Sequence, residues 1–205
     1  MRGDRQIYTL EQSSAHMKPE EVLATIERAA PRQGLPIIGP KRGKFLDEAI
    51  ELHRPSTILE VGTLVGYSAI RMARHLGDRG RLTCVELSEE RARTARANFK
   101  LADLSDRIEI IIGDARKVLP SLTGRFDMVF FDAVKEDYLA YLKSIERLLH
   151  RGSVVVADNV KSHAMEVAPY LEYVRNSGKY SSTYKESPPN SGSGPGDAVE
   201  ISVRL

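Results

Sequence analysis

The chain has 205 residues, with 30 Lys and Arg against 28 Asp and Glu, a net charge of +2 and a single cysteine. This length favours one domain, large enough for a sizeable core and a ligand cleft. The near-zero charge argues against a general nucleic-acid binder, which carries a basic excess. One cysteine excludes a disulfide framework and a multi-cysteine zinc site. No apolar run approaches the roughly 20 residues that span a bilayer, and the first residues lack the apolar stretch of a secretion signal, so we expect a cytoplasmic location.

Two segments differ in composition from the rest of the chain. Residues 1–16 are polar and show no periodicity, which predicts a loose N-terminal arm. Residues 187–196 contain only Ser, Pro, Asn and Gly. This composition predicts a mobile loop, placed between possible strands at 180–186 and 198–205. The remainder, 17–205, is predicted to form a single domain.

Short apolar runs alternate with helical patterns between these segments. Five runs are predicted strands, at 57–61, 81–86, 108–112, 126–131 and 153–157. Most are too continuously apolar for a sheet with one solvated face, which favours parallel strands covered on both faces. Helical patterns are expected at 67–76, 89–101, 115–121 and 136–149. This alternation predicts a doubly wound α/β sheet, which binds ligands beyond the carboxyl ends of its strands.

A glycine-containing turn follows the first predicted strand, in the segment Glu60-Val-Gly-Thr-Leu-Val-Gly-Tyr-Ser68. Gly62 and Gly66 let the backbone turn tightly and approach a ligand, and the helix that follows offers free amides. The spacing is not the G-x-G-x-x-G of dinucleotide sites, which disfavours a nicotinamide dehydrogenase, and no Walker lysine is present. A tight turn without a ligand is the alternative.

Acidic residues end the second and third predicted strands. Glu86 lies about twenty residues after the turn, where an acid accepts hydrogen bonds from the ribose hydroxyls of an adenosine ligand. Asp114 and Ala115 follow the third strand, where they would line an adenine pocket. Alternatively, Asp114 caps the helix that begins near Ala115. Gly62, Glu86 and Asp114 follow or end three successive predicted strands, and together they predict a nucleoside site.

Oxygen-bearing side chains end the fourth and fifth predicted strands. Asp132 follows one strand, and Asp158 and Asn159 follow the other. If these strands are adjacent, the three side chains converge on one edge of the sheet and suit Mg²⁺, which takes a few protein oxygens. Two carboxylates without a cation would repel each other. The alternative is that each residue independently caps a helix.

Lys135 lies three residues after Asp132, at the predicted start of a helix. A cation there faces the positive end of the helix dipole, so local propensity does not explain it. A role beside a metal site does, because positive surroundings favour the neutral amine that a general base requires. A lysine that extends into solvent is the alternative.

These residues resemble the cation-dependent O-methyltransferases that use S-adenosylmethionine, and among them most closely the catechol O-methyltransferases. The resemblance runs from about Met17 to the C-terminus. Besides the glycine-containing turn with its helix, three blocks carry it, in the family's order: Gly39-Pro-Lys-Arg-Gly43 with the helix that follows it, Phe130-Phe-Asp-Ala-Val-Lys-Glu-Asp-Tyr138 and Val156-Ala-Asp-Asn-Val160.

The resemblance implies a Rossmann-like class I methyltransferase fold, with a mostly parallel seven-stranded sheet whose last strand is antiparallel. That strand, 198–203, would insert between the fifth strand and 180–186. S-adenosylmethionine and Mg²⁺ or another divalent cation are the implied cofactors. Lys135 is the implied base, and Lys135 and Asn159 the implied substrate contacts. Ser68 would hold the cofactor's carboxylate, and Glu86 its ribose. The implied metal ligands are Asp132, Asp158 and Asn159. The implied cofactor-binding residues are Ile38, Glu60, Gly62, Ser68, Glu86, Asp114, Ala115 and Asp132.

The departures from the family pattern fall on the acceptor side. The chain has no tryptophan, and Leu35 and Val134 stand where catechol enzymes have aromatic walls. His163 replaces a proline and is either an acceptor contact or a surface residue at a helix start. No acid clearly matches the one that holds the second hydroxyl; Pro189 or Asn190 falls nearest its place.

The expected reaction is methylation of one hydroxyl of a vicinal diphenol. Methylation of a hydroxylated nucleoside in RNA and a non-catalytic S-adenosylmethionine-binding protein are the alternatives. The expected partner is a phenolic small molecule, with neither a membrane nor nucleic acid. Monomer and homodimer are both open.

Overall fold

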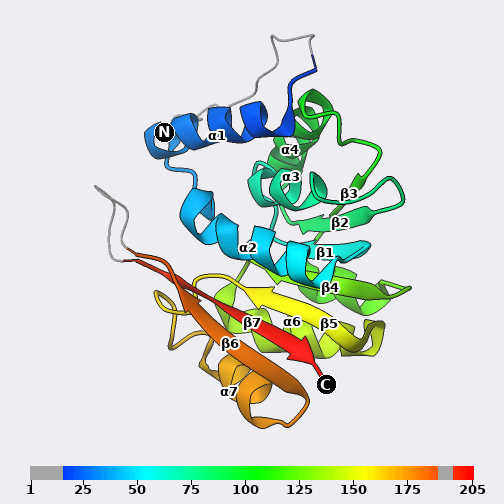
Figure 1. Cartoon of the computed structure of the whole chain (residues 1–205), viewed down its shortest axis with the longest axis vertical. Coiled ribbons are helices and arrows are strands. Elements are labelled where there is room, and N and C mark those ends of the chain that lie inside the picture. The colour runs from blue at the N-terminus through cyan, green and yellow to red at the C-terminus, as the bar shows by residue number, and fades with distance from the viewer. Residues whose placement is uncertain (1–15, 189–195) are drawn as a thin grey trace.

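The apolar runs predicted as strands form one seven-stranded sheet in the computed structural model, which describes residues 16–188 and 196–205 (Figure 1). The strand order is β3-β2-β1-β4-β5-β7-β6, and β7 is antiparallel to both of its neighbours. This confirms the predicted class I methyltransferase sheet and the insertion of the last strand between the fifth and the sixth. The strands are β1 Thr57–Val61, β2 Arg81–Glu86, β3 Ile108–Ile112, β4 Phe126–Phe131, β5 Leu149–Ala157, β6 Tyr180–Glu186 and β7 Ala198–Arg204.

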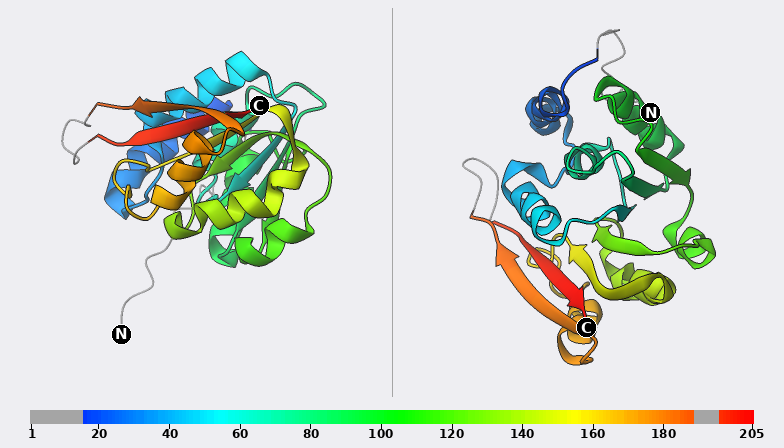
Figure 2. Two further views of the ribbon diagram at one scale, coloured as in Figure 1. Left: turned by 90° about the horizontal axis from the view of Figure 1, so that it is seen from below. Right: turned by 45° about the vertical axis from the view of Figure 1, so that its right-hand side comes forward.

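Helices cover both faces of the sheet (Figure 2). Each face has its own apolar core, because successive residues of a strand point to opposite faces. In β1, Ile58 belongs to one core, and Leu59 and Val61 belong to the other. The first core packs against α1 Pro19–Gln33, α2 Gly39–His53, α3 Tyr67–Ala73 and α4 Glu89–Leu101. The second packs against α5 Ala115–Val118, α6 Tyr138–Ile145 and α7 Ala168–Asn176.

The order of the strands reverses between β1 and β4. From β1 the chain proceeds outward through β2 and β3, and from β4 it proceeds the other way through β5. The two strands pair in parallel with Val61 opposite Phe131. Their carboxyl ends therefore lie together, at the place where sheets of this kind bind ligands.

The helix predicted at 136–149 is wrong at both ends. It begins with a 3₁₀ turn, Lys135–Asp137, and α6 ends at Ile145 before a second 3₁₀ turn, Glu146–Leu148. Strand β5 then starts at Leu149, four residues earlier than predicted, and its pairing with β4 shifts register beside Gly152. The hydroxyl of Ser153 holds this irregularity by accepting from the amide of His150 and donating to the carbonyl of Phe126.

Other boundaries differ less. The pattern at 115–121 forms α5 and a 3₁₀ turn, and α3 ends at Ala73. Helices α1 and α7 were not among the predicted elements. The predicted N-terminal arm, apart from His16, and residues 189–195 of the predicted loop lie outside the described residues. No helix in the described part of the chain is long and apolar enough to cross a bilayer.

Candidate active site

Two glycines shape the turn between β1 and α3. Gly62 has φ 91°, and a Cβ on it would lie 2.3 Å from the carbonyl oxygen of Asp132. Gly66 has φ 85°, and a Cβ there would lie 2.4 Å from the ring of Phe99. Both the left-handed backbone and the close approach exclude a larger side chain. The turn therefore packs tightly against β4 and α4.

Glu86 fixes the same turn from the end of β2. One carboxylate oxygen accepts from the amides of Thr63 and Leu64, at 3.1 and 2.9 Å, and the other accepts from the amide of Ser88 at 3.0 Å. Leu64 has φ 52°, which is unusual for a leucine. A carboxylate has about four acceptor positions, so Glu86 keeps capacity for further donors. The sequence predicted only a ribose contact for Glu86, and its role in holding the turn was not predicted.

A cavity of about 550 Å³ opens at the carboxyl ends of the strands. Most of the predicted site residues line it, so the structure brings together segments far apart in the chain. Glu60 and Asp158 are not among its lining residues, and both are buried. The predicted residues that line it are Ile38, Gly62, Ser68, Glu86, Asp114, Ala115, Asp132, Lys135 and Asn159.

Glu60 is a buried acid on β1 with an incomplete set of hydrogen bonds. The Ser68 hydroxyl donates to its Oε1 at 2.5 Å, whereas its Oε2 has no donor among the described residues. Burial raises the pKa of Glu60 to about 7, against the opposing effect of the Ser68 hydrogen bond. The hydroxyl of Ser68 is thus engaged within the protein, and its predicted contact with the cofactor's carboxylate stays a prediction.

Asp114 both caps a helix and lines the cavity, the two positions between which the sequence left it open. Its carboxylate accepts from the amide of Arg116 at 2.9 Å, as the N-cap of α5, and it also lines the cavity. Hydrogen bonds from Arg116 lower the pKa of Asp114. Capping and a place beside a ligand are therefore compatible here.

The predicted metal ligands lie at the ends of two paired strands. Because β4 and β5 run parallel with Phe131 opposite Ala157, the next residues, Asp132 and Asp158, are neighbours. The two oxygens of Asp158 are buried, and neither accepts a hydrogen bond from the described residues. Burial and the nearby Asp132 raise the pKa of Asp158 to about 8, although the Arg42 guanidinium 3.5 Å away opposes this.

A buried carboxylate without a donor is costly unless a cation is its partner. No group of three His, Cys, Asp or Glu side chains converges within the described residues, so the donor set would be two carboxylates and the Asn159 amide. Oxygen donors in this number suit Mg²⁺, which fills its octahedron with water or substrate. The residues present therefore fit a hard divalent cation.

Lys135 is the first residue of the 3₁₀ turn that runs directly into α6, so it lies at a helix start as predicted. Its Nζ donates to Oδ1 of Asp132 at 2.7 Å and to the hydroxyl of Tyr138 at 2.9 Å. The side chain is 12% exposed, so the alternative of a lysine extending into solvent is wrong. The ion pair with Asp132 explains a position that the helix dipole alone opposes.

Comparison with known proteins places these features in a family. The family model described as O-methyltransferase matches residues 11–175. Catechol O-methyltransferase of Sus scrofa is 36% identical over 158 residues, 73% of this chain and 83% of that protein. The Mycobacterium tuberculosis protein of the same name is 41% identical over 124 residues, which are 60% of this chain and 56% of that protein. This chain belongs to the O-methyltransferase family.

Solved structures agree with this family and with the predicted enzyme class. An O-methyltransferase from Bacillus cereus, in complex with SAH, is 29% identical and superposes with a TM-score of 0.79 over 90% of this chain and 91% of that chain. The O-methyltransferase TomG from Streptomyces achromogenes, in complex with SAM, has the same identity and TM-score, over 90% and 89%.

The acceptor side of this O-methyltransferase differs from the predicted walls. Val134 lines the cavity and is 52% exposed, whereas Leu35 packs against the first core and is not among the lining residues. Pro36 and Ile37 line the cavity in its place. His163 is half-buried in a turn at 160–167 and lines the cavity, so the interpretation as a surface residue at a helix start is wrong.

Three residues of the site escaped sequence reasoning: Arg42, Tyr138 and Asp197. Tyr138 was interpreted as a packing residue, and it does pack against Phe131, but its hydroxyl also accepts from Lys135 and donates to the Phe131 carbonyl at 3.0 Å. Arg42 lay in a recognised block without an assigned role. Asp197 gave no signal, because its contact with Arg42 joins residues 155 positions apart.

Proposed function

We propose that this O-methyltransferase transfers the methyl group of S-adenosylmethionine to one hydroxyl of a vicinal diphenol, with Mg²⁺ or another divalent cation. The observation that carries the proposal is Asp158, a buried carboxylate without a hydrogen-bond donor. It lies beside Asp132, which is in turn paired with Lys135. A site for binding alone does not require a paired lysine next to a cation site, so this arrangement favours catalysis over a non-catalytic S-adenosylmethionine-binding protein.

The chain's own residues account for holding the cofactor. Glu86, Asp114 and Ala115 would bind the nucleoside end, and Ile38, Gly62 and Ser68 would line the methionine end. Glu60 does not line the cavity and would contribute through Ser68, whose hydroxyl donates to it. When bound, S-adenosylmethionine supplies the methyl group, and the cation supplies positive charge that favours the ionised form of an acceptor hydroxyl.

Lys135 would accept the proton of that hydroxyl. Its amine is held by Tyr138 and reaches Asp132, so it stands at the edge of the cation site. In the balanced reaction, the carbon–sulfur bond of the sulfonium breaks and a carbon–oxygen bond forms. The proton of the hydroxyl passes to the Lys135 amine, which must be neutral to accept it; a cation bound by Asp132 would disfavour the ammonium form that otherwise pairs with this carboxylate. The other residues contribute alignment of the two reacting groups.

A diphenol fits the site better than a nucleoside in RNA. Two adjacent oxygens can both reach a cation held by Asp132, Asp158 and Asn159, whereas the chain carries little net positive charge for a polyanion. The relatives named catechol O-methyltransferase support the same class. The cytoplasmic location, and the choice between monomer and homodimer, stay predictions.

The test is a methyl-transfer assay with product detection by mass spectrometry. Catechol and caffeate are compared with phenol, which lacks the second hydroxyl, and with 5-hydroxyuridine, each with Mg²⁺ and with excess EDTA. We expect methylated catechol and caffeate only when Mg²⁺ is present, and little product from phenol. Equal turnover in EDTA would overturn the role of the cation, and turnover of 5-hydroxyuridine alone would replace the diphenol by a nucleoside.

A further inference from the structure

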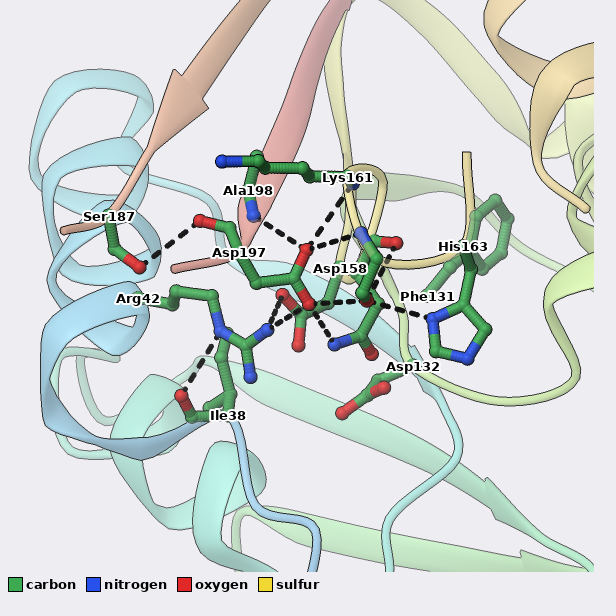
Figure 3. A network of polar contacts seen from close by, with 12 residues as sticks. Ile38, Arg42, Phe131, Asp132, Asp158, Lys161, His163, Ser187, Asp197 and Ala198 are labelled. Carbon is green, nitrogen blue, oxygen red and sulfur yellow. Dashed lines mark hydrogen bonds and ion pairs between the residues drawn. The ribbon is translucent and has the colours of Figure 1, made fainter. Parts of the chain in front are cut away.

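Asp197 is a hub of hydrogen bonds next to the predicted metal ligands (Figure 3). It directly precedes β7, and its carboxylate is largely buried. It accepts from three backbone amides and three side chains. The amide donors are Lys161, Ser162 and Ala198, and the side-chain donors are Arg42 Nη1, Asn159 Nδ2 and Ser162 Oγ, the last three each at 2.7 Å.

The contact with Asn159 determines how that amide is oriented. A carboxylate only accepts hydrogen bonds, so the NH₂ group of Asn159 must face Asp197. The amide oxygen of Asn159 is then left for the cavity that this residue lines. Asn159 also has φ 62°, a backbone conformation in which this residue type is tolerated. Without Asp197, the amide is free to turn its NH₂ group, which cannot bind a cation, towards the site.

The contact with Arg42 determines how closely a guanidinium approaches Asp158. Arg42 Nη1 lies 2.7 Å from Asp197 but 3.5 Å from Oδ1 of Asp158. It therefore offsets part of the charge of Asp158 without satisfying its oxygens. If Asp197 were absent, Arg42 would be free to close on Asp158 and compete with a cation for the same oxygens.

We propose that Asp197 is a positioning residue that keeps the metal site open, by directing the Asn159 oxygen towards the cavity and by holding Arg42 back from Asp158. This inference rests on the proposed function, because it assigns Asp158 and Asn159 to a cation. It concerns residues contributed by α2, by the segment after β5 and by the segment before β7. The carboxylate therefore ties three separate parts of the chain to one site.

The test measures cation binding directly, with Mn²⁺ as the probe and electron paramagnetic resonance to count the free ion. We compare wild type with Asp197→Ala and with the isosteric Asp197→Asn, in case the first fails to fold. Loss of a group that orients metal ligands weakens metal binding by about 10–100-fold. We expect a loss in this range, while the affinity for S-adenosylhomocysteine, measured by calorimetry without metal, stays within about twofold of wild type.

A matched control and a double variant separate the role of Asp197 from a general loss of structure. Glu186 forms an exposed ion pair with Lys161 in the same region, so Glu186→Gln should keep the wild-type affinity for Mn²⁺. In Asp197→Ala, the further change Arg42→Met should restore part of the lost affinity, because the competing guanidinium is gone.

Two results would overturn the inference. A folded Asp197→Ala or Asp197→Asn protein that binds Mn²⁺ within threefold of wild type would show that Asp197 does not position the ligands. A wild-type protein that binds no Mn²⁺ at all would overturn the metal site itself, and with it the proposed function. The comparison of wild type with the variants therefore tells the two failures apart.

Discussion

Carboxylates differ in their hydrogen bonding between the two edges of the sheet, that is, between the carboxyl ends and the amino ends of its parallel strands. At the carboxyl ends of the strands, Glu60 and Asp158 are buried, each with at least one oxygen that has no donor among the described residues. Their pKa values are raised to about 7 and about 8, mainly by burial. At the opposite edge, Asp127 is the second residue of β4, and both of its carboxylate oxygens have partners within the protein.

Asp127 joins the start of β1 to β4 and β5. Its Oδ2 accepts from the amides of Ser56 and Thr57 at 2.7 and 2.9 Å and from the Thr57 hydroxyl at 3.0 Å. Its Oδ1 pairs with His150 at 2.9 Å. Burial opposes ionisation, but the hydrogen bonds from His150 and the two amides outweigh it and lower the pKa of Asp127.

The same chemical group, an aspartate carboxylate, stabilises the fold at one edge of the sheet and forms part of the proposed site at the other. Asp127 and Asp132 are five residues apart on and after one strand, about 16 Å of extended chain. The first is satisfied by the protein's own donors and holds strands together. The second, with Asp158, belongs to a set that a ligand must complete. Substitutions at the carboxyl ends of the strands should therefore lower activity or ligand binding, whereas substitution of Asp127 should lower stability.

The largest effect is expected at Lys135. Lys135→Ala removes the proposed proton acceptor, and general bases contribute about 10²–10⁴-fold to rate. We expect kcat at pH 7 to fall by that factor and the residual rate to rise with pH as solvent takes the proton. Lys143→Ala is the control, because Lys143 packs over the ring of Tyr173 away from the site. A wild-type kcat in Lys135→Ala would show that the proton leaves by another route.

Glu86→Ala should weaken cofactor binding next most strongly. The change removes charge-assisted hydrogen bonds to the ribose, each worth about 1.5–3 kcal/mol, and frees the amides of Thr63 and Leu64. We expect S-adenosylhomocysteine to bind about 10–1,000-fold more weakly by calorimetry. The affinity for Mn²⁺ should change little. An unchanged cofactor affinity would mean that the ribose lies elsewhere.

At the opposite edge, Asp127→Ala should cost stability and leave the site intact. The substitution leaves the amides of Ser56 and Thr57 and the ring of His150 without their partner. We expect the free energy of unfolding in urea to fall by about 1–3 kcal/mol. Cofactor affinity should match wild type. Unchanged stability would contradict the role given to this carboxylate.

The smallest effect is a pH dependence at His150. The carbonyl of Arg151 and then Asp127 raise the pKa of His150 above its ordinary 6.5. Its contribution is therefore complete below about pH 6.5 and is lost as the pH rises through the raised value. His150→Gln should lower the free energy of unfolding by under about 1 kcal/mol at pH 5.5, because the pair is partly exposed, and by less at pH 9. An equal loss at both pH values would contradict this.

Much of the fold follows from local patterns, whereas part of the site does not. The bounds of β1 to β4 were predicted because apolar runs between turns are visible in a short window. The start of β5 was missed because an irregularity at Gly152, held by Ser153, lets polar residues join the strand. Residues at strand ends could be assigned by the topology rule, which is how Glu86, Asp132 and Asp158 were found.

Residues that position another side chain of the site could not be predicted from local sequence patterns. Asp197 meets Asn159 and Arg42 only after the last strand inserts beside β5. From the sequence, Tyr138 is predicted only as a packing residue, whereas in the structure its hydroxyl also accepts a hydrogen bond from Lys135. Such contacts depend on tertiary structure, which neither periodicity nor spacing encodes.

The most direct test of the contrast between the edges is the effect of Mg²⁺ on thermal unfolding. A ligand that binds only the folded state stabilises it, and at ten times its dissociation constant this raises the Tm of a chain of this size by about 3–6 °C. We predict this rise for wild type and for Asp127→Ala, and none for Asp158→Asn. A rise in Asp158→Asn equal to that of wild type, or no rise in wild type, would contradict the account.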